Sequence, residues 1–145
     1  MKKGAPAIIP MNADVLMIGV DPRHFDHYQR MVKGGLQSMN MGWNYVANPA
    51  ESFGYAIEFL AKRPELDLVF IANQVDWNDD ELRDGVTALA EALAKHPAKP
   101  WVVLNPGLEW LRPAFLAEGV NVDGVSIEVA LWERHRRKTE SAEAA

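Results

Sequence analysis

Seven polar and aromatic residues lie just beyond three predicted strands, in the positions where parallel sheets gather ligands and catalytic groups. They are Asp21, His24, Asn73, Asp76, Trp77, Asn105 and Trp110. Carboxylate, imidazole and amide groups at one sheet edge can bind a polar ligand, and loop tryptophans are frequent anchors for a partner protein. The sequence therefore predicts a binding rim at the carboxyl edge of a sheet, and it leaves open whether the rim binds a protein or a small molecule.

The two tryptophans of this rim differ in their local sequence. Trp77 stands in a loop directly before a helix cap, where a core role is less natural. Pro106 and Pro113 flank Trp110 and can fold its segment back against the domain. We therefore expect Trp77 to be the more exposed of the two tryptophans.

Histidines and acids at the start of the first predicted helix raise the question of a metal site. His24 and His27 are three residues apart and can share a helix face, and Asp21 and Asp26 lie beside them. Such side chains can bind a metal ion, but the sequence places no third strong ligand with them. A solvated polar helix face is the favoured interpretation, and neither a metal nor a cofactor is predicted.

Composition limits the classes of function. The chain has 145 residues, which is the size of one domain, and its net charge of -5 argues against general nucleic-acid binding. It has no cysteine and therefore neither disulfides nor thiolate chemistry. Since no apolar run approaches the length of about 20 residues that spans a membrane, we expect no membrane association and a cytoplasmic protein.

No known phosphate-binding loop follows the first predicted strand. That strand runs into Gly19-Val20-Asp21-Pro22, which has neither the dinucleotide fingerprint nor a P-loop. The basic run at residues 134–138 is typical of the solvated end of a C-terminal helix. The alternative is that this run binds an acidic partner.

Apolar runs and helix-start signals predict the elements that position these residues. Strands are expected at residues 15–20, 43–47, 66–72, 101–104 and 120–127. Helices are expected to begin at Asp21-Pro22, at Asn48-Pro49 and at Asn78, and a further helix to follow Arg112. Residues 128–138 either continue the last strand or form a terminal helix, and the helix is favoured.

Strands and helices thus alternate five times along the chain. This order predicts a single α/β/α domain with a five-stranded parallel sheet of flavodoxin-like strand order 2-1-3-4-5. Residues 14–138 should form the domain, residues 1–13 an irregular lead-in and residues 139–145 a disordered tail.

Residues 14–137 together resemble a response-regulator receiver domain. The third strand of that family typically reads Asp-Leu-Val-apolar-apolar-Asp, and residues 67–72 match it up to the last position, which is Ala72. The Asp-Pro that often follows the first strand corresponds to Asp21-Pro22. With these aligned, the metal-binding acid pair falls on Gly19 and Val20, and the switch hydroxyl on Asn105. The expected lysine has no counterpart near Ser126-Ile127.

Phosphotransfer in that family requires a carboxylate nucleophile and acids that hold Mg²⁺. The resemblance therefore implies a pseudo-receiver: a non-catalytic, phosphorylation-independent protein–protein interaction module in signalling or assembly. Its partner would be another protein or a second copy of the chain, forming a homodimer.

The alternative is a small-molecule-binding protein or a small α/β enzyme that uses the rim. Cobalamin-binding domains share the fold and carry Asp-x-His-x-x-Gly after the first strand. Here Asp21-Pro22-Arg23-His24 is one residue longer and lacks the glycine. A cavity of several hundred Å³ with converging polar groups would favour this alternative, and an exposed apolar patch or a two-fold interface would favour the interaction module.

Overall fold

The computed structural model describes residues 11–38, 43–123 and 126–144 and contains one five-stranded sheet. The strands are β1 (Met11–Ile18), β2 (Trp43–Ala50), β3 (Leu68–Ile71), β4 (Trp101–Leu104) and β5 (Val122–Asp123). The helices are α1 (Pro22–Ser38), α2 (Phe53–Lys62), α3 (Asp79–Ala94), the 3-10 helix η1 (Pro106–Leu111), α4 (Arg112–Leu116) and α5 (Ile127–Ala144).

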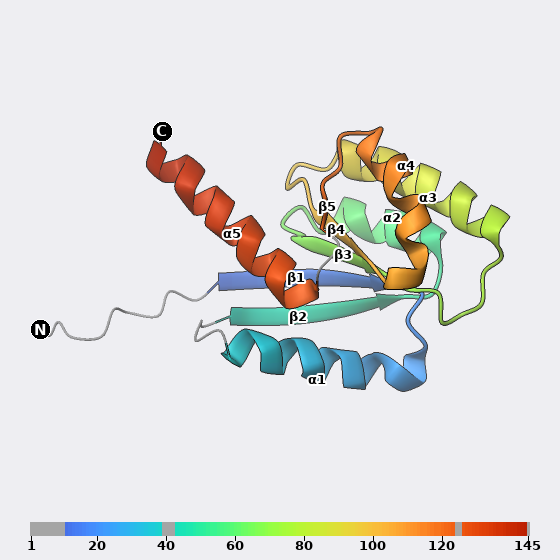
Figure 1. Ribbon diagram of the computed structural model, residues 1–145, viewed down its shortest axis with the longest axis horizontal. Coiled ribbons are helices and arrows are strands. Elements are labelled where there is room, and N and C mark those ends of the chain that lie inside the picture. The colour runs from blue at the N-terminus through green and yellow to red at the C-terminus, as the bar shows by residue number, and fades with distance from the viewer. Residues whose placement is uncertain (1–10, 39–42, 124–125, 145) are drawn as a thin grey trace, which may run out of the picture.

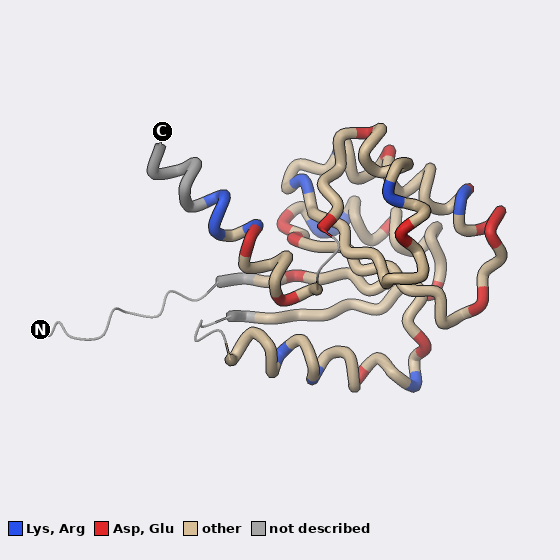
Figure 2. The backbone as a smooth tube through the Cα atoms, viewed as in Figure 1, with Lys and Arg blue, Asp and Glu red and all other residues tan. Residues whose placement is uncertain are grey.

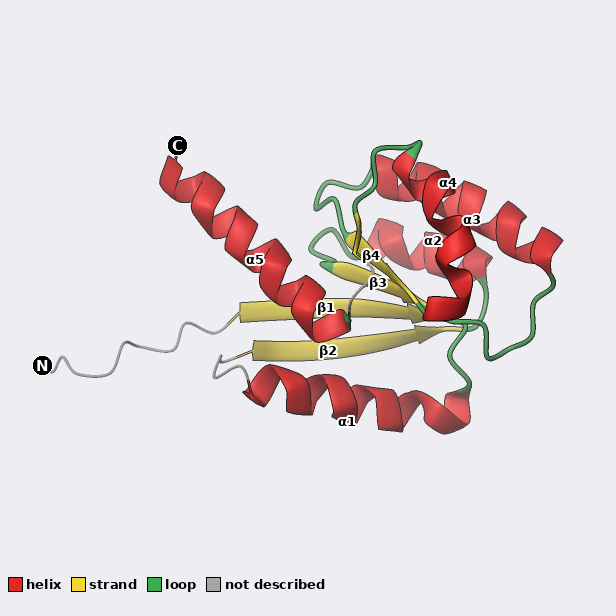
Figure 3. Cartoon of the chain, in the orientation of Figure 1, coloured by secondary structure: helices red, strands yellow, loops and turns green. Residues whose placement is uncertain are grey.

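All neighbouring strands are parallel, and their order is β2-β1-β3-β4-β5. This confirms the predicted α/β fold with its flavodoxin-like strand order. Helices cover both faces of the sheet (Figure 3). Figure 1 shows α1 and α5 on one face and α2, α3 and α4 on the other. The chain changes direction across the sheet between β1 and β3, so the carboxyl ends of these two strands mark the topological switch point.

Alternate residues of the central strands supply two separate cores. Leu16 and Ile18 point toward the core under α2 and α3, while Val15 and Met17 point toward the core under α1 and α5. Each strand is therefore apolar on both faces, which is why β1 and β3 read as continuous apolar runs in the sequence.

Two predicted boundaries at the N-terminal half are wrong. The lead-in was expected to reach Ala13, but β1 already begins at Met11, and residues 1–10 lie outside the described part. The helix predicted to begin at Asn48-Pro49 begins at Phe53 instead, with Ser52 as its cap, because residues 48–50 complete β2. A proline is tolerated there since β2 is an edge strand.

The C-terminal region resolves the choice that the sequence left open. Strand β5 is shorter than predicted, and residues 124–125 of the expected strand lie outside the described residues. Segment 128–138 is helical, because Ile127, Ala130, Leu131 and Arg134 recur at helical spacing and are all buried. The predicted disordered tail is wrong for residues 139–144, whose backbone continues α5, while Ala145 lies outside the description.

Removal of the last residues is nevertheless expected to leave stability almost unchanged. Residues 139–145 contain no large apolar side chain, so their contacts should return little free energy for the entropy lost on ordering. A chain truncated after Lys138 should melt within about two degrees of the full-length protein by thermal denaturation, since a shift of that size corresponds to a fraction of a kcal/mol. A much larger drop would mean that this end of α5 docks.

No membrane-crossing segment is found among the helices of the described ranges, since none is both long and apolar enough.

Candidate functional site

A glycine with an unusual backbone lies at the switch point of the sheet. Gly19 directly follows β1 and has a φ of +76°, in the left-handed region that favours glycine. A Cβ at this position would lie 2.2 Å from the carbonyl oxygen of Ala72, which directly follows β3. Any side chain at Gly19 would therefore both strain the backbone and collide with the neighbouring strand end.

The side chain of Trp77 fills the space that Gly19 leaves. Its Cζ3 atom lies 2.7 Å from where a Gly19 Cβ would be, and its ring centroid lies 4.7 Å from that of Phe53. The half-buried Trp77 thus packs against the core under α2 and α3. The expectation that Trp77 is the more exposed tryptophan is wrong, because the glycine opposite it opens a slot that a loop tryptophan can enter.

Asn73 fixes the loop that carries Trp77. Its Nδ2 donates to the carbonyl oxygen of Trp77 at 2.9 Å, and its Oδ1 accepts from the Trp77 backbone N–H at 2.8 Å. Asp76, between them, is exposed and has a φ of +68°. Asn73 therefore positions the tryptophan within its loop, and Asp76 lies on the outer side of the turn.

Gln74 ties together the two loops on either side of the switch point. Its Oε1 accepts from the Asp21 backbone N–H at 2.8 Å, and its Nε2 donates to the Tyr28 hydroxyl at 3.0 Å. Its own backbone N–H donates to the carbonyl oxygen of Gly19 at 2.9 Å. Gln74 was not among the predicted site residues, although an amide close after a central strand was an available signal. Together Trp77 and Gln74 occupy the crevice in which this fold commonly holds a ligand.

The receiver resemblance would assign an active site to Gly19, Val20, Ala72 and Asn105, and none of these four residues has an acidic side chain. Val20 and Ala72 are buried, and the Ala72 N–H donates to the Ile18 carbonyl oxygen at 2.9 Å. The backbone N–H of Asn105 donates to the Ile71 carbonyl oxygen at 2.9 Å. Neither a methyl nor an isopropyl group can accept a phosphoryl group or bind a cation.

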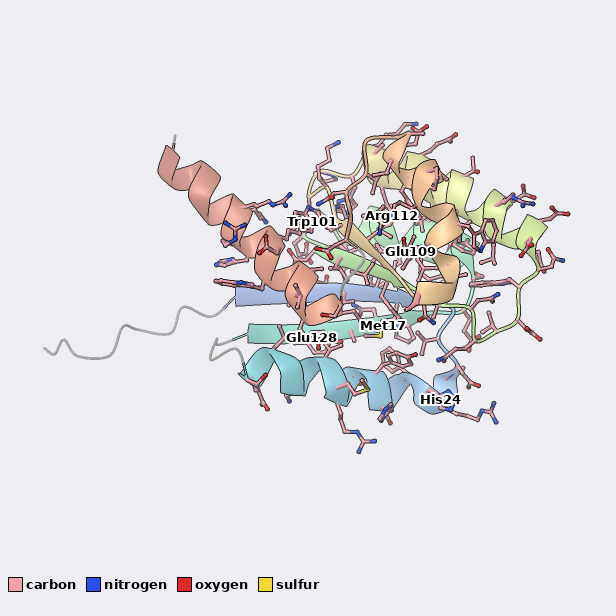
Figure 4. All side chains as sticks on the ribbon, viewed as in Figure 1. Met17, His24, Trp101, Glu109, Arg112 and Glu128 are labelled. Atoms are coloured by element: carbon pink, nitrogen blue, oxygen red, sulfur yellow. The ribbon has the colours of Figure 1, made fainter. Side chains whose placement is uncertain are left out.

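Asp21 and His24 do not converge on a common site. The carboxylate of Asp21 binds Arg23, whose Nη2 lies 2.7 Å from its Oδ2. The hydrogen bonds from the Arg23 side chain and backbone lower the pKa of Asp21 to about 2. His24 is exposed and projects from the start of α1 into solvent (Figure 4). Across the described residues, no group of three or more His, Asp or Glu side chains is arranged to hold a metal ion.

Trp110 is the exposed member of the predicted pair. It is 41% exposed, and the guanidinium of Arg83 lies 5.1 Å from its ring centroid. Its segment is held in place by Arg112, which pairs with Glu109 at 2.9 Å and donates to the Val122 carbonyl oxygen at 3.1 Å (Figure 4). Six residues further on, Leu116 is 52% exposed. Two large apolar side chains are thus presented to solvent on a short, anchored segment, η1–α4.

A second feature of the carboxyl edge is an open cleft of about 490 Å³ beside β1 and β2. It is lined by Val20, Pro22, Phe25, Pro49, Glu51, Ser52 and Tyr55. Most of these side chains are apolar, and the Ser52 hydroxyl oxygen already accepts from the Tyr55 N–H at 3.1 Å. Neither Phe25 nor Tyr55 was among the predicted site residues, because the cleft forms only where the ends of β1 and β2 meet.

The chain matches no protein-family model, and none of the curated proteins compared with it is significantly similar. What the protein does must therefore be inferred from its own side chains.

Proposed function

We propose that this chain is a non-catalytic protein–protein interaction module of pseudo-receiver type, which acts without phosphorylation in signalling or assembly in the cytoplasm. The observation that carries the proposal is the closed switch point: Trp77 and Gln74 occupy the crevice where this fold commonly binds a ligand. Meanwhile Trp110 and Leu116 remain exposed on an anchored segment. Exposed aromatic side chains on rigid elements are typical anchors of protein interfaces.

Phosphorylation is the first property to test. Incubation with acetyl phosphate and Mg²⁺, followed by intact mass measurement, should leave the mass unchanged, because Ala72 offers no carboxylate and Gly19 and Val20 offer no metal ligand. A receiver domain with its aspartate intact serves as the positive control in the same reaction. A stoichiometric phosphate adduct on this chain would contradict the proposal.

If Trp110 anchors a partner protein, the Trp110→Ala variant should bind that partner more weakly. Removal of a central aromatic anchor should weaken binding by about 2 kcal/mol or more, because the ring is presented to solvent rather than packed in a core. Affinity capture from the native host, quantified by mass spectrometry, should identify proteins retained by the unchanged chain and lost with the variant.

Met31→Ala is the matched control, since Met31 is an exposed apolar residue, 57% exposed, on the opposite face of the sheet. Sedimentation equilibrium of the same variants tests whether the partner is a second copy. If both variants retain the same partners and the same mass in solution as the unchanged chain, Trp110 is not the anchor.

Binding of a small molecule is the second candidate, and the cleft beside β1 and β2 favours it. Its volume of about 490 Å³ lies within the usual range for ligand pockets. Native mass spectrometry of the protein isolated from its own host should then detect a retained ligand, and Tyr55→Ala should release it. If the isolated protein has the mass of the ligand-free chain, the cleft is not supported as a binding site.

A further inference from the structure

A second open cleft, of about 410 Å³, lies at the amino edge of the sheet, beneath α5. It is lined by Ala98, Lys99, Trp101, Arg134, Arg137 and Lys138. Figure 2 shows Lys and Arg residues gathered on α5, and Figure 4 places Trp101 beside that helix. The chain as a whole carries a net charge of -5, so the charge of this cleft is opposite in sign to that of the whole chain.

Arg134 forms the inner wall of the cleft and is fixed by the fold. Its Nη1 donates to Asp67 Oδ1 at 2.6 Å, and its Nη2 donates to the Ala98 carbonyl oxygen. The other oxygen of Asp67 accepts from the Asp14 backbone N–H at 3.0 Å. The negative charge of Asp67 is thus committed to Arg134 and the sheet edge, and it offsets only one of the positive charges of the cleft.

The other positive charges that line the cleft belong to Arg137, Lys99 and Lys138. Arg137 lies over the ring of Trp101, with its guanidinium carbon 5.0 Å from the ring centroid, and its Nε is 4.0 Å from Glu133. Lys99 donates to the Ala94 carbonyl oxygen from a backbone with a φ of +49°. Partial desolvation and the neighbouring Arg134 charge lower the pKa of Lys138. An anion in the cleft would relieve this repulsion between like charges.

We propose that this cleft binds a phosphate-bearing ligand, held by Arg137, Lys138 and Lys99 against the fixed guanidinium of Arg134. A phosphate group fits better than a single carboxylate because it carries a charge of about -1.5 to -2 and three acceptor oxygens, which several cations can share. Arg137 already covers one face of Trp101, so charge on the phosphate, rather than stacking of an aromatic ring on that face, would provide the recognition.

This site is separate from the proposed protein-binding segment. The cleft lies at the start of β4, whereas η1 and Trp110 follow the end of that strand. Ligand binding here and partner binding there can therefore succeed or fail independently.

Calorimetric titration with pyrophosphate at low ionic strength tests the proposal. The unchanged protein should bind it, and the double variant Arg137→Gln/Lys138→Gln should bind at least about tenfold more weakly, because each exposed cation near a phosphate contributes a charge-assisted contact. Arg83→Gln is the matched control, because Arg83 also lies over a tryptophan but belongs to α3, away from the cleft. The affinity of this variant for pyrophosphate should stay within about twofold of that of the unchanged protein. Circular dichroism confirms that each variant is folded.

A flotation experiment identifies the source of the phosphate. Binding to phosphatidic acid vesicles but not to phosphatidylcholine vesicles indicates a lipid headgroup. Binding to pyrophosphate but not to vesicles indicates a free phosphate ester. Either result supports the proposal provided that the double variant removes it. The proposal is overturned if neither ligand binds, if the double variant and the unchanged protein bind equally, or if a poly-glutamate peptide binds while both phosphate ligands do not.

Discussion

Replacing Trp77 with alanine is expected to lower the free energy of unfolding by about 3–5 kcal/mol, the usual cost of truncating a packed tryptophan. The ring contacts Phe53 at a centroid distance of 4.7 Å and occupies the slot above Gly19. Gly19 has no side chain that could fill the cavity left by the ring. Chemical denaturation in urea measures the loss directly.

Trp110→Ala is the control for this experiment, since it removes the same side chain from an exposed position. Its effect on stability should stay below about 1 kcal/mol. Trp77→Phe, which keeps an aromatic ring against Phe53, should fall between the two and remains measurable if the alanine variant does not fold. Equal and small losses for Trp77→Ala and Trp110→Ala would show that the Trp77 ring does not fill the switch point.

The positions of the central strands were predictable because their apolar runs carry the information locally. The segment Leu68–Ile71 is apolar at every position, as expected for a strand covered on both faces, and it lies at the centre of the sheet. The capping signal at Asn78 was equally local: its side chain accepts from the Glu81 N–H, and the Glu81 side chain accepts from the Asn78 N–H. Signals that lie within a few residues therefore placed these two elements correctly.

The start of α2 was misplaced because a long-range contact outcompetes a local signal. Asn48 resembles a helix cap in the sequence, but its Nδ2 donates to Asp14 Oδ1 at 2.8 Å, and its Oδ1 accepts from Arg63 Nη2 at 3.1 Å. These bonds hold Asn48 in the edge strand, and Ser52 takes over the capping role. Nothing near Asn48 in the sequence indicates that Asp14 and Arg63 would lie beside it.

The edge of the sheet at which the candidate site lies was predictable, but the side chains that fill it were not. Parallel topology brings the loops of Asn73 and Asp21 to one edge, as expected. That Trp77 turns inward depends on the missing side chain of Gly19, 58 residues earlier in the chain. Similarly, the basic run on α5 was interpreted as a solvated helix end, whereas Arg134 is 5% exposed and pairs with Asp67.

That buried pair leads to the second large effect, the loss of stability in Arg134→Ala. The side chains of Asp67 and Arg134 are 13% and 6% exposed, and their closest charged atoms are 2.6 Å apart. Without the guanidinium, the Asp67 carboxylate loses its ion-pair partner in a largely buried position, and the Ala98 carbonyl oxygen loses its donor. Breaking a buried pair from one side typically costs about 3–5 kcal/mol, and urea denaturation should show a loss of this size.

A double-variant cycle distinguishes the pair from general packing. Because Asp67→Asn removes the charge that Arg134 neutralises, the Arg134→Ala change should cost substantially less in the Asp67→Asn background than in the unchanged protein. Arg23→Ala is the matched control, since its side chain is 83% exposed in the pair with Asp21, and exposed pairs contribute only about 0–1 kcal/mol. If Arg134→Ala costs the same in both backgrounds, the stabilisation comes from packing of the arginine side chain rather than from its charge.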